Sequence, residues 1–330
     1  MRIERKNREN IPEKLKSFYY FNFTEHNFIH GELFSDKYYG NVIEVIAGIA
    51  DYCRKWLAEE SSSCGRYRSI TPPGNSLVHG RFEVFARDEV TFLPSTVIGP
   101  ANGGPGRLFI SKGAQVIGAA LFLDRGDIFI GENTTLQPGS CLKGPVIIGA
   151  ENDIRPGCFF RGDVISGAGC ILGCEAKNAV FLDYADFPHP SYVGDSLLGF
   201  GTHFGNQVTA ANFGIFSSML PVAKQKNIIV KVDDVKYDTG LKKLGLVLGD
   251  YSQVGCSSVT DPGTFLGPRT MVYSLTRLQK GFYGPNQIIK NKPLEKGVLE
   301  ISPLMNQDQT GAPDVDIDSA SPVRRRFNGL

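Results

Sequence analysis

The 330-residue chain lacks an excess of charge of either sign. Its 35 Lys and Arg residues against 34 Asp and Glu residues leave a formal net charge of +1. Proteins that bind nucleic acid usually carry a basic excess or a basic face, so this balance argues against a nucleic-acid partner.

Long apolar runs are missing as well. None approaches the roughly 20 residues that cross a bilayer, and the first six residues, MRIERK, are charged where a secretory leader would become apolar. From these two absences we expect a cytoplasmic protein with no membrane partner.

Metal-binding spacing is also lacking. The seven cysteines match no zinc pattern, and the closest pair, Cys170 and Cys174, has no third and fourth ligand nearby. The five histidines are scattered. We therefore expect reduced cysteines that pack in the core, no disulfide scaffold and no metal.

Glycine, by contrast, is abundant: 38 of the 330 residues, against about 7% in an average protein, and without the every-third spacing of collagen. Many glycines follow aliphatic residues that recur every six positions. A six-residue period is too long for a strand or a helix and is typical of a parallel β-helix, in which stacked coils bury an aliphatic column. The series slips at Ser166 within the run Ile130, Leu136, Leu142, Ile148, Ile154, Phe160, Ser166 and Leu172.

The chain divides into three parts by these patterns. Residues 1–84 are expected to form a partly helical adaptor segment, with an amphipathic helix over residues 41–60. Its aromatic run at residues 18–23 suits a core, or the recruitment of a protein partner. Residues 85–300 are expected to form the β-helix, interrupted by an insertion at residues 213–240, and the polar tail 301–330 is expected to be disordered.

One segment combines groups that suit proton transfer. A coil takes about 18 residues, so positions roughly one coil apart lie near one another. Glu175 and His189 are slightly closer than that in sequence and could meet across adjacent coils. A carboxylate beside an imidazole orients the ring and favours proton uptake, as a general base requires. Asp195 is interpreted as a turn residue.

The same segment carries a family resemblance. The run CEAKNAVFLDYADFPHPSYVGDSLLG (residues 174–199), with VTAAN (208–212) and TGLKKLGLVLGD (239–250), resembles the acetyltransferase half of bifunctional sugar-1-phosphate nucleotidylyltransferase/amino-sugar acetyltransferases, such as the glucosamine-1-phosphate enzyme of bacteria. The resemblance covers roughly residues 85–290. It implies a left-handed β-helix, a homotrimer, and acetyl-CoA bound between subunits.

The resemblance also implies roles for individual residues. His189 matches the family's catalytic histidine and Glu175 the carboxylate that orients it. The matches to substrate contacts are Arg155, Lys177, Tyr192, Asn212, Lys243 and His203, with Arg155 on the sugar phosphate and Asn212 near the amine. The matches to coenzyme contacts are Asn206, Gln207, Cys256 and Ser274.

The implied reaction is transfer of acetyl from acetyl-CoA to the amine of a phosphorylated or nucleotide-linked amino sugar. His189 would accept the amine's proton, backbone N–H groups would bind the oxyanion, and no metal would be needed. Cations at Arg155 and Lys177 would hold the acceptor phosphate.

Two departures from the family stand out. Residues 203–208 read HFGNQV where the family typically has NIGAGT, so an acceptor-binding asparagine is replaced by His203, and two small residues by Asn206 and Gln207. The first eighty residues contain no Gly-rich phosphate loop, so nucleotidyl transfer is not expected.

Two alternatives remain open at the level of sequence. A catalytically silent trimeric β-helix could serve as a binding or scaffold protein through its N-terminal segment. A metal-dependent enzyme of the γ-carbonic anhydrase kind would need three histidines converging between subunits, and only His189 and His203 lie in the later coils.

Overall fold

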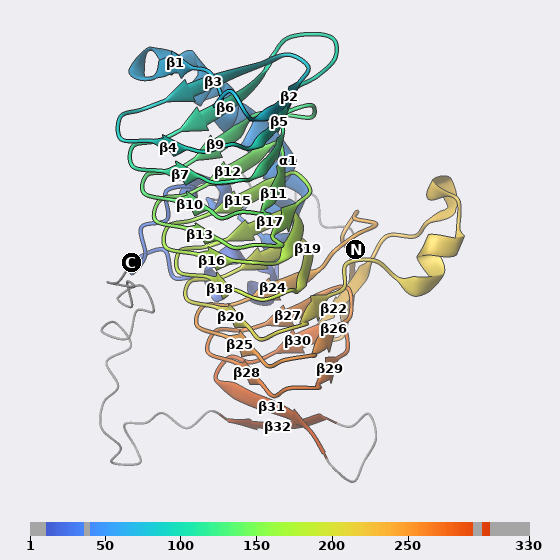
Figure 1. Cartoon of the computed structure of the whole chain (residues 1–330). Coiled ribbons are helices and arrows are strands. Elements are labelled where there is room, and N and C mark those ends of the chain that lie inside the picture. The colour runs from blue at the N-terminus through green and yellow to red at the C-terminus, as the bar shows by residue number, and fades with distance from the viewer. Residues whose placement is uncertain (1–10, 36–39, 293–298, 304–330) are drawn as a thin grey trace, which may run out of the picture.

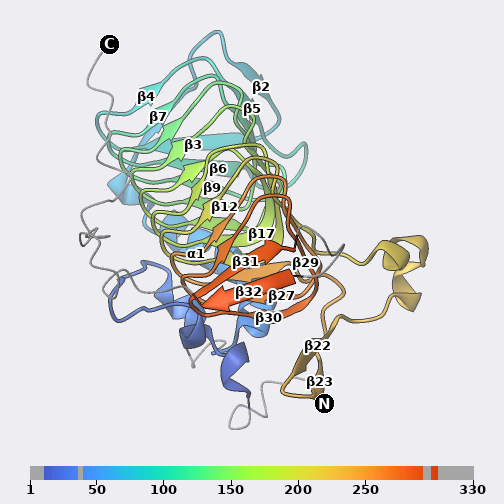
Figure 2. The same cartoon turned by 90° about the horizontal axis from the view of Figure 1, so that it is seen from below.

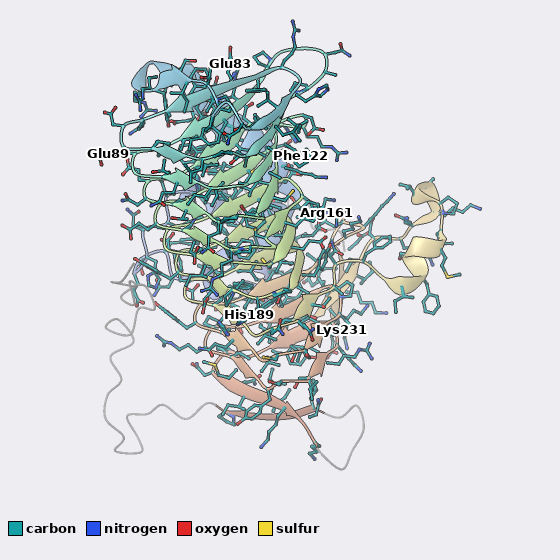
Figure 3. The ribbon with its side chains drawn as sticks, viewed as in Figure 1. Glu83, Glu89, Phe122, Arg161, His189 and Lys231 are labelled. Atoms are coloured by element: carbon teal, nitrogen blue, oxygen red, sulfur yellow. The ribbon has the colours of Figure 1, made fainter. Side chains whose placement is uncertain are left out.

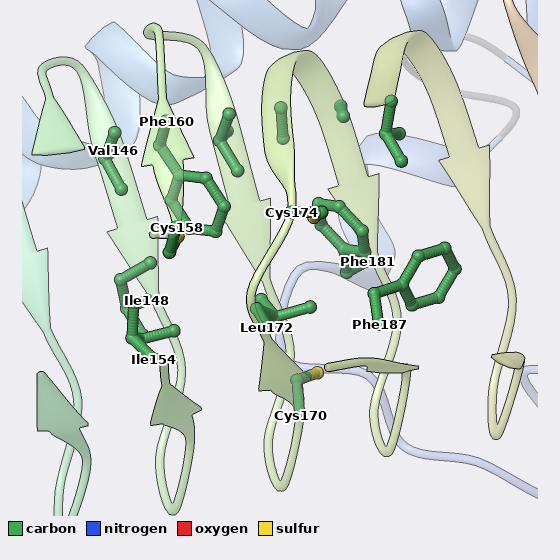
Figure 4. Close-up of a cluster of buried hydrophobic side chains, with 14 of the residues drawn as sticks. Val146, Ile148, Ile154, Cys158, Phe160, Cys170, Leu172, Cys174, Phe181 and Phe187 are labelled. Atoms are coloured by element: carbon green, nitrogen blue, oxygen red, sulfur yellow. The ribbon is translucent and has the colours of Figure 1, made fainter. Parts of the chain in front are cut away.

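The six-residue spacing of aliphatic residues corresponds to a left-handed parallel β-helix of about 12 turns (Figure 1). The structure, a computed structural model, describes residues 11–35, 40–292 and 299–303. The repeat positions Ile130, Leu136, Leu142, Ile148, Ile154 and Phe160 all have no exposed surface, which confirms the predicted column. Figure 4 shows part of it, where Phe160, Leu172 and Phe187 lie on successive coils.

Each complete coil contributes one short strand to each of three faces. Face 1 consists of β4 (Thr91–Phe92), β7 (Gln115–Val116), β10 (Thr135–Leu136), β13 (Asp153–Ile154), β16 (Ile171–Leu172), β18 (Asp186–Phe187), β20 (His203–Phe204), β25 (Gln253–Val254), β28 (Met271–Val272) and β31 (Gln287–Asn291). These strands are paired in parallel, and β32 (Leu299–Pro303) then runs antiparallel to β31.

Face 2 consists of β2 (Leu77–His79), β5 (Thr96–Ile98), β8 (Ala120–Phe122), β11 (Cys141–Lys143), β14 (Phe159–Phe160), the first halves of β17 (Glu175–Phe181) and β19 (Tyr192–Leu198), β21 (Thr209–Ala210), β26 (Val259–Thr260) and β29 (Arg277–Leu278). The parallel pairing of face 2 therefore begins at Leu77.

Face 3 consists of β3 (Phe82–Ala86), β6 (Gly106–Ile110), β9 (Ile128–Ile130), β12 (Val146–Ile148), β15 (Val164–Ser166), the second halves of β17 and β19, β24 (Leu246–Leu248), β27 (Thr264–Leu266) and β30 (Gly281–Tyr283). At its first coil, β1 (Arg68–Ile70) pairs antiparallel with β3.

The slip of the repeat at Ser166 has a structural reason. Ser166 occupies an inward position on face 3, level with Ile148, and is fully buried. Its Oγ accepts a hydrogen bond from Asn152 Nδ2 at 2.8 Å. The hydroxyl is therefore satisfied by a buried amide of the preceding coil, and the column continues at Leu172.

The N-terminal segment packs along face 3 (Figure 2). It contains η2 (Glu13–Leu15), η3 (Ser17–Tyr19), η4 (Gly31–Phe34), α1 (Val42–Ser62) and η5 (Cys64–Arg66). The helix predicted over residues 41–60 is thus confirmed as α1. Within the aromatic run, Tyr20 and Phe21 are buried, whereas Phe18 is 62% exposed. Most of this run contributes to a second core, shared with outward residues of face 3 such as Ile165 and Val247.

The insertion after β21 projects from the corner between faces 2 and 3 (Figure 1). It contains η6 (Ile215–Met219), η7 (Val222–Lys224) and a hairpin of β22 (Ile229–Val232) and β23 (Val235–Asp238). Disorder is predicted for the tail 301–330, and residues 304–330 of it lie outside the described residues.

Candidate functional site

Four of the residues singled out by the sequence form one row on the corner between faces 1 and 2, named here corner A. Each of these residues lies two positions after the end of a face 1 strand: His189 after β18, Asn206 after β20, Cys256 after β25 and Ser274 after β28. All four are exposed. The row therefore runs along four consecutive coils, with Gln207 beside Asn206. Adjacent strands of a sheet lie about 4.8 Å apart, which sets the spacing along the row.

Corner A is shorter at one coil than at its neighbours. Register pairs Ile154 with Leu172 and Phe159 with Glu175, so residues 173–174 form this turn where residues 155–158 form the previous one. The next turn again has four residues, 188–191. A Cβ on Gly173 would lie 2.4 Å from the Pro188 carbonyl oxygen, so the short turn lies directly against the turn that carries His189.

Glu175 does not contact His189. Its Oε1 accepts a hydrogen bond from Arg161 Nη1 at 2.7 Å, across adjacent coils of face 2. Arg161 and His189, both labelled in Figure 3, lie on different coils. Within the described part of the chain, the His189 ring has no hydrogen-bond partner. The arrangement expected from the sequence, an imidazole oriented by Glu175, is therefore not formed in this structure.

A carboxylate–imidazole pair does exist, on face 1. Asp186 in β18 is paired in register with His203 in β20, and His203 Nδ1 lies 3.0 Å from Asp186 Oδ2. Both side chains are half-buried. Sequence reasoning treated His203 as a substrate contact and did not single out Asp186. The signal was their separation of 17 residues, the same as between Glu175 and Tyr192, which also pair in register.

Arg155 lies over face 1, three coils before His203. Its Nε is 3.4 Å from Asp153 Oδ2, and Asp153 Oδ1 also accepts a hydrogen bond from Gln137 Nε2 at 2.5 Å. The Arg155 side chain is 37% exposed, so its guanidinium can also bind an anion on the side away from Asp153.

A second group lies on the corner between faces 2 and 3, named here corner B. Asn212 donates to Asp195 Oδ2 at 2.5 Å, and Asn178 donates to Asp195 Oδ1 at 2.9 Å. Asp195 and Asn212 are 7% and 8% exposed. Asp195, interpreted as a turn residue, does have a turn conformation with φ of +49°, and it is also the acceptor that holds Asn212.

The remaining substrate candidates flank this buried group. The Tyr192 hydroxyl is hydrogen-bonded to Asn212, and burial, followed by the charge of Asp195, raises the pKa of Tyr192. Lys177 is paired in register with Gly194 on the adjacent coil. Lys243 is exposed, with its Nζ 5.4 Å from the centre of the Phe213 ring. The candidates therefore occupy both edges of face 2 rather than a single cluster.

Within the ranges that the structure describes, no three His, Cys, Asp or Glu side chains of this chain converge as a metal site would require. None of the helices described is both long and apolar enough to cross a membrane.

Comparison with known sequences finds partial matches only. No family model matches the chain. It is 28% identical over 99 residues to a bifunctional sugar-1-phosphate nucleotidylyltransferase/acetyltransferase of Sulfurisphaera tokodaii, and 30% identical over 98 residues to the bifunctional protein GlmU of Methanococcus maripaludis. These matches cover 30% of this chain and 23% and 22% of the two relatives, so they span about a quarter of the relatives' length. The resemblance to bifunctional enzymes of this kind is thereby confirmed over that stretch.

Solved structures give weaker likenesses. The polysialic acid O-acetyltransferase OatWY is 13% identical with a TM-score of 0.24, covering 71% of this chain and 83% of that one. The polysialic acid-specific acetyltransferase NeuO is 10% identical with a TM-score of 0.23, covering 77% and 93%. At these values the two likenesses carry no argument about function.

Proposed function

We propose that this chain is a coenzyme A-dependent acyltransferase that moves acetyl from acetyl-CoA to the amine of a phosphorylated or nucleotide-linked amino sugar. The observation that carries the proposal is the match of 99 residues to a bifunctional transferase whose name includes an acetyltransferase. The exposed row on corner A supports it, because the residues matched to coenzyme contacts follow one another there on successive coils.

The acyl donor would lie along corner A. Asn206, Cys256 and Ser274 present exposed polar side chains over a length of about 10 Å, which suits the extended arm of coenzyme A. Backbone N–H groups of the turns would bind the oxyanion that forms when the thioester carbonyl is attacked. Arg155 supplies a cation for the acceptor phosphate beside corner A, whereas Lys177, Tyr192, Asn212 and Lys243 line the opposite edge of face 2.

The acceptor amine must lose a proton as it attacks the thioester. Two imidazoles lie close enough to corner A to be considered, His189 on the corner itself and His203 on face 1. We place His189 against the acceptor, because it is exposed beside the short turn at residues 173–174.

We also propose a homotrimer in the cytoplasm. The N-terminal segment covers face 3, whereas corner A and the two faces that meet there are left for neighbouring subunits and substrate. A single chain exposes the whole row from His189 to Ser274, and a neighbouring subunit would enclose it.

A catalytically silent scaffold is the second candidate function. Two observations favour it: Arg161 occupies the carboxylate of Glu175, and the insertion exposes Ile215, Phe216 and Met219 by 77–82%. Apolar side chains exposed together on a projecting loop are typical of protein-binding surfaces.

Thiol release from acetyl-CoA separates the two functions. The acceptors are glucosamine-1-phosphate, galactosamine-1-phosphate and UDP-linked amino sugars. For the transferase we expect turnover with at least one acceptor, and a loss of at least tenfold in kcat/KM for His189→Ala, with wild-type activity in His79→Gln, an exposed histidine of the first coil. Wild-type thiol release no greater than that of a reaction without protein, on every acceptor, would remove the transferase hypothesis for these substrates.

A further inference from the structure

The Asp186–His203 pair has the geometry of an oriented base. With the carboxylate at Nδ1, 3.0 Å away, the neutral ring carries its proton on Nδ1 and presents the lone pair of Nε2 outward. The His203 side chain is 34% exposed, and Nε2 has no hydrogen-bond partner among the described residues. The pair can therefore receive a proton from a group outside the protein.

The neighbours of the pair leave the carboxylate free to act on the ring. In the same column of face 1, the preceding coil places Ile171 beside Asp186, and the following coil places Gln253 beside His203. Neither residue is charged. The nearest ion pair in the column, Arg155 with Asp153, lies one coil beyond Ile171. By contrast, Glu175 on face 2 is already neutralised by Arg161.

The pair borders the same corner as the exposed row. Asp186 precedes His189 by three residues on one coil, and His203 precedes Asn206 by three on the next, which is about 10 Å of extended chain. The two turns are stacked, because the Gln207 amide donates to the Pro190 carbonyl at 2.8 Å. An acceptor the size of a sugar phosphate spans that distance.

We propose that Asp186 and His203 form the proton-accepting dyad of the acyl transfer, with His189 contacting the acceptor rather than acting as the base. This inference rests on the proposed transferase function. His203 Nε2 takes the proton of the acceptor amine as its nitrogen bonds to the thioester carbon. The C–S bond then breaks, and the coenzyme A sulfur leaves with the proton from the imidazolium, so the dyad returns to its starting state.

The kinetic test uses the full chain and the acceptor that gives turnover. We expect His203→Gln to lower kcat at least 100-fold with KM within threefold, because general-base catalysis contributes roughly that much. Asp186→Asn should lower kcat about tenfold, since Asp186 positions the ring, whereas His189→Gln should act mainly on KM. The control is again His79→Gln. Undiminished kcat in His203→Gln would overturn the inference.

A measurement independent of turnover tests the pair itself. With ring-¹⁵N histidine, NMR at alkaline pH should show neutral His203 with its proton on Nδ1, and Asp186→Asn should shift the proton towards Nε2. A wild-type ring protonated on Nε2 would contradict the dyad. Wild-type protein without turnover on any acceptor would refute the transferase function, and the dyad's catalytic role with it. Turnover that survives His203→Gln would refute the dyad alone.

Discussion

Asp250 shows how one buried carboxyl group links two parts of the chain. It accepts backbone hydrogen bonds from Asn22 of the N-terminal segment at 2.7 Å and from Phe200 at 2.9 Å. Burial raises its pKa from 3.8 to about 7, a rise to which Glu25 adds and which these hydrogen bonds and Arg269 reduce. A carboxyl group on this contact therefore titrates near neutrality.

The sign of the resulting pH dependence follows from linkage. The folded pKa lies above the unfolded value, so the stability that the protonated group contributes is complete below about pH 4 and is lost as pH rises to about 7. The expected loss is about 4 kcal/mol at most. Asp250→Asn should flatten the dependence of unfolding free energy on pH over this range, as measured by urea unfolding. The exposed-site variant Asp88→Asn should keep the wild-type slope; a slope unchanged in Asp250→Asn would contradict the assignment.

For single residues, the sequence predicted which side chains are buried better than which side chains pair across coils. The burial of the aliphatic column follows from the local six-residue pattern. The ion pair of Arg161 with Glu175 and the pairing of Asp186 with His203 depend on how many residues each coil uses. That number falls at residues 173–174: Phe159 pairs with Glu175 across 16 residues and Glu175 with Tyr192 across 17, so a fixed coil of about 18 residues misplaces these pairs by two positions and one.

At the scale of elements, α1 begins at a side-chain cap. Asn41 is fully buried, and its Oδ1 accepts from the backbone N–H groups of Ile43 at 3.1 Å and Glu44 at 3.0 Å. These donors have no partner inside the helix, so the cap satisfies them. The cap also fixes where the chain turns onto face 3.

Removing the cap should weaken this element measurably. We expect Asn41→Ala to lower the free energy of unfolding by about 1–2 kcal/mol, and Asn41→Asp, which keeps an acceptor oxygen, to lower it less. Chemical denaturation followed by the fluorescence of Trp56, the single tryptophan, which lies in α1, reports on the helix directly. Equal losses in the two variants would show that the cap is not what stabilises this end.

The elements that the sequence did not predict are those set by tertiary packing. The six-residue period predicts strands and turns, since each aliphatic residue must point inward. The period does not predict that outward residues of face 3, such as Ile147 and Phe265, are buried. They are buried because α1 and the aromatic run cover them. The sequence suggested an adaptor because the segment has apolar residues that need a surface to pack on. In the structure, that surface is face 3 of the same chain.

For the whole molecule, glycine sets how closely the coils stack. A Cβ built on Gly149 would lie 2.2 Å from the Gly167 carbonyl oxygen on the next coil, where only backbone is available to move. Gly131 makes the same kind of approach to Gly149. The glycine content therefore reflects the distance between coils as well as the turns.

A methyl group at this position should act on the entire stack. We expect Gly149→Ala to lower the free energy of unfolding by about 1–3 kcal/mol, as overpacking does elsewhere. Gly104→Ala is the matched control, because a Cβ there meets no atom within 4 Å, and it should change stability by less than about 0.5 kcal/mol. Thermal unfolding followed by circular dichroism compares them; similar curves for the two variants would disprove the close-packing argument.

The reversed strands at the two ends of the β-helix bear on self-association. A stack of parallel strands presents unpaired N–H and C=O groups at each end, a template on which another copy could continue the stack. Here β1 covers β3 at the first coil, and β32 covers β31 at the last, both running against the direction of the coils. A second molecule that meets β1 or β32 finds a strand of the opposite polarity to the coils, so these two strands do not offer the parallel edge on which the stack would continue.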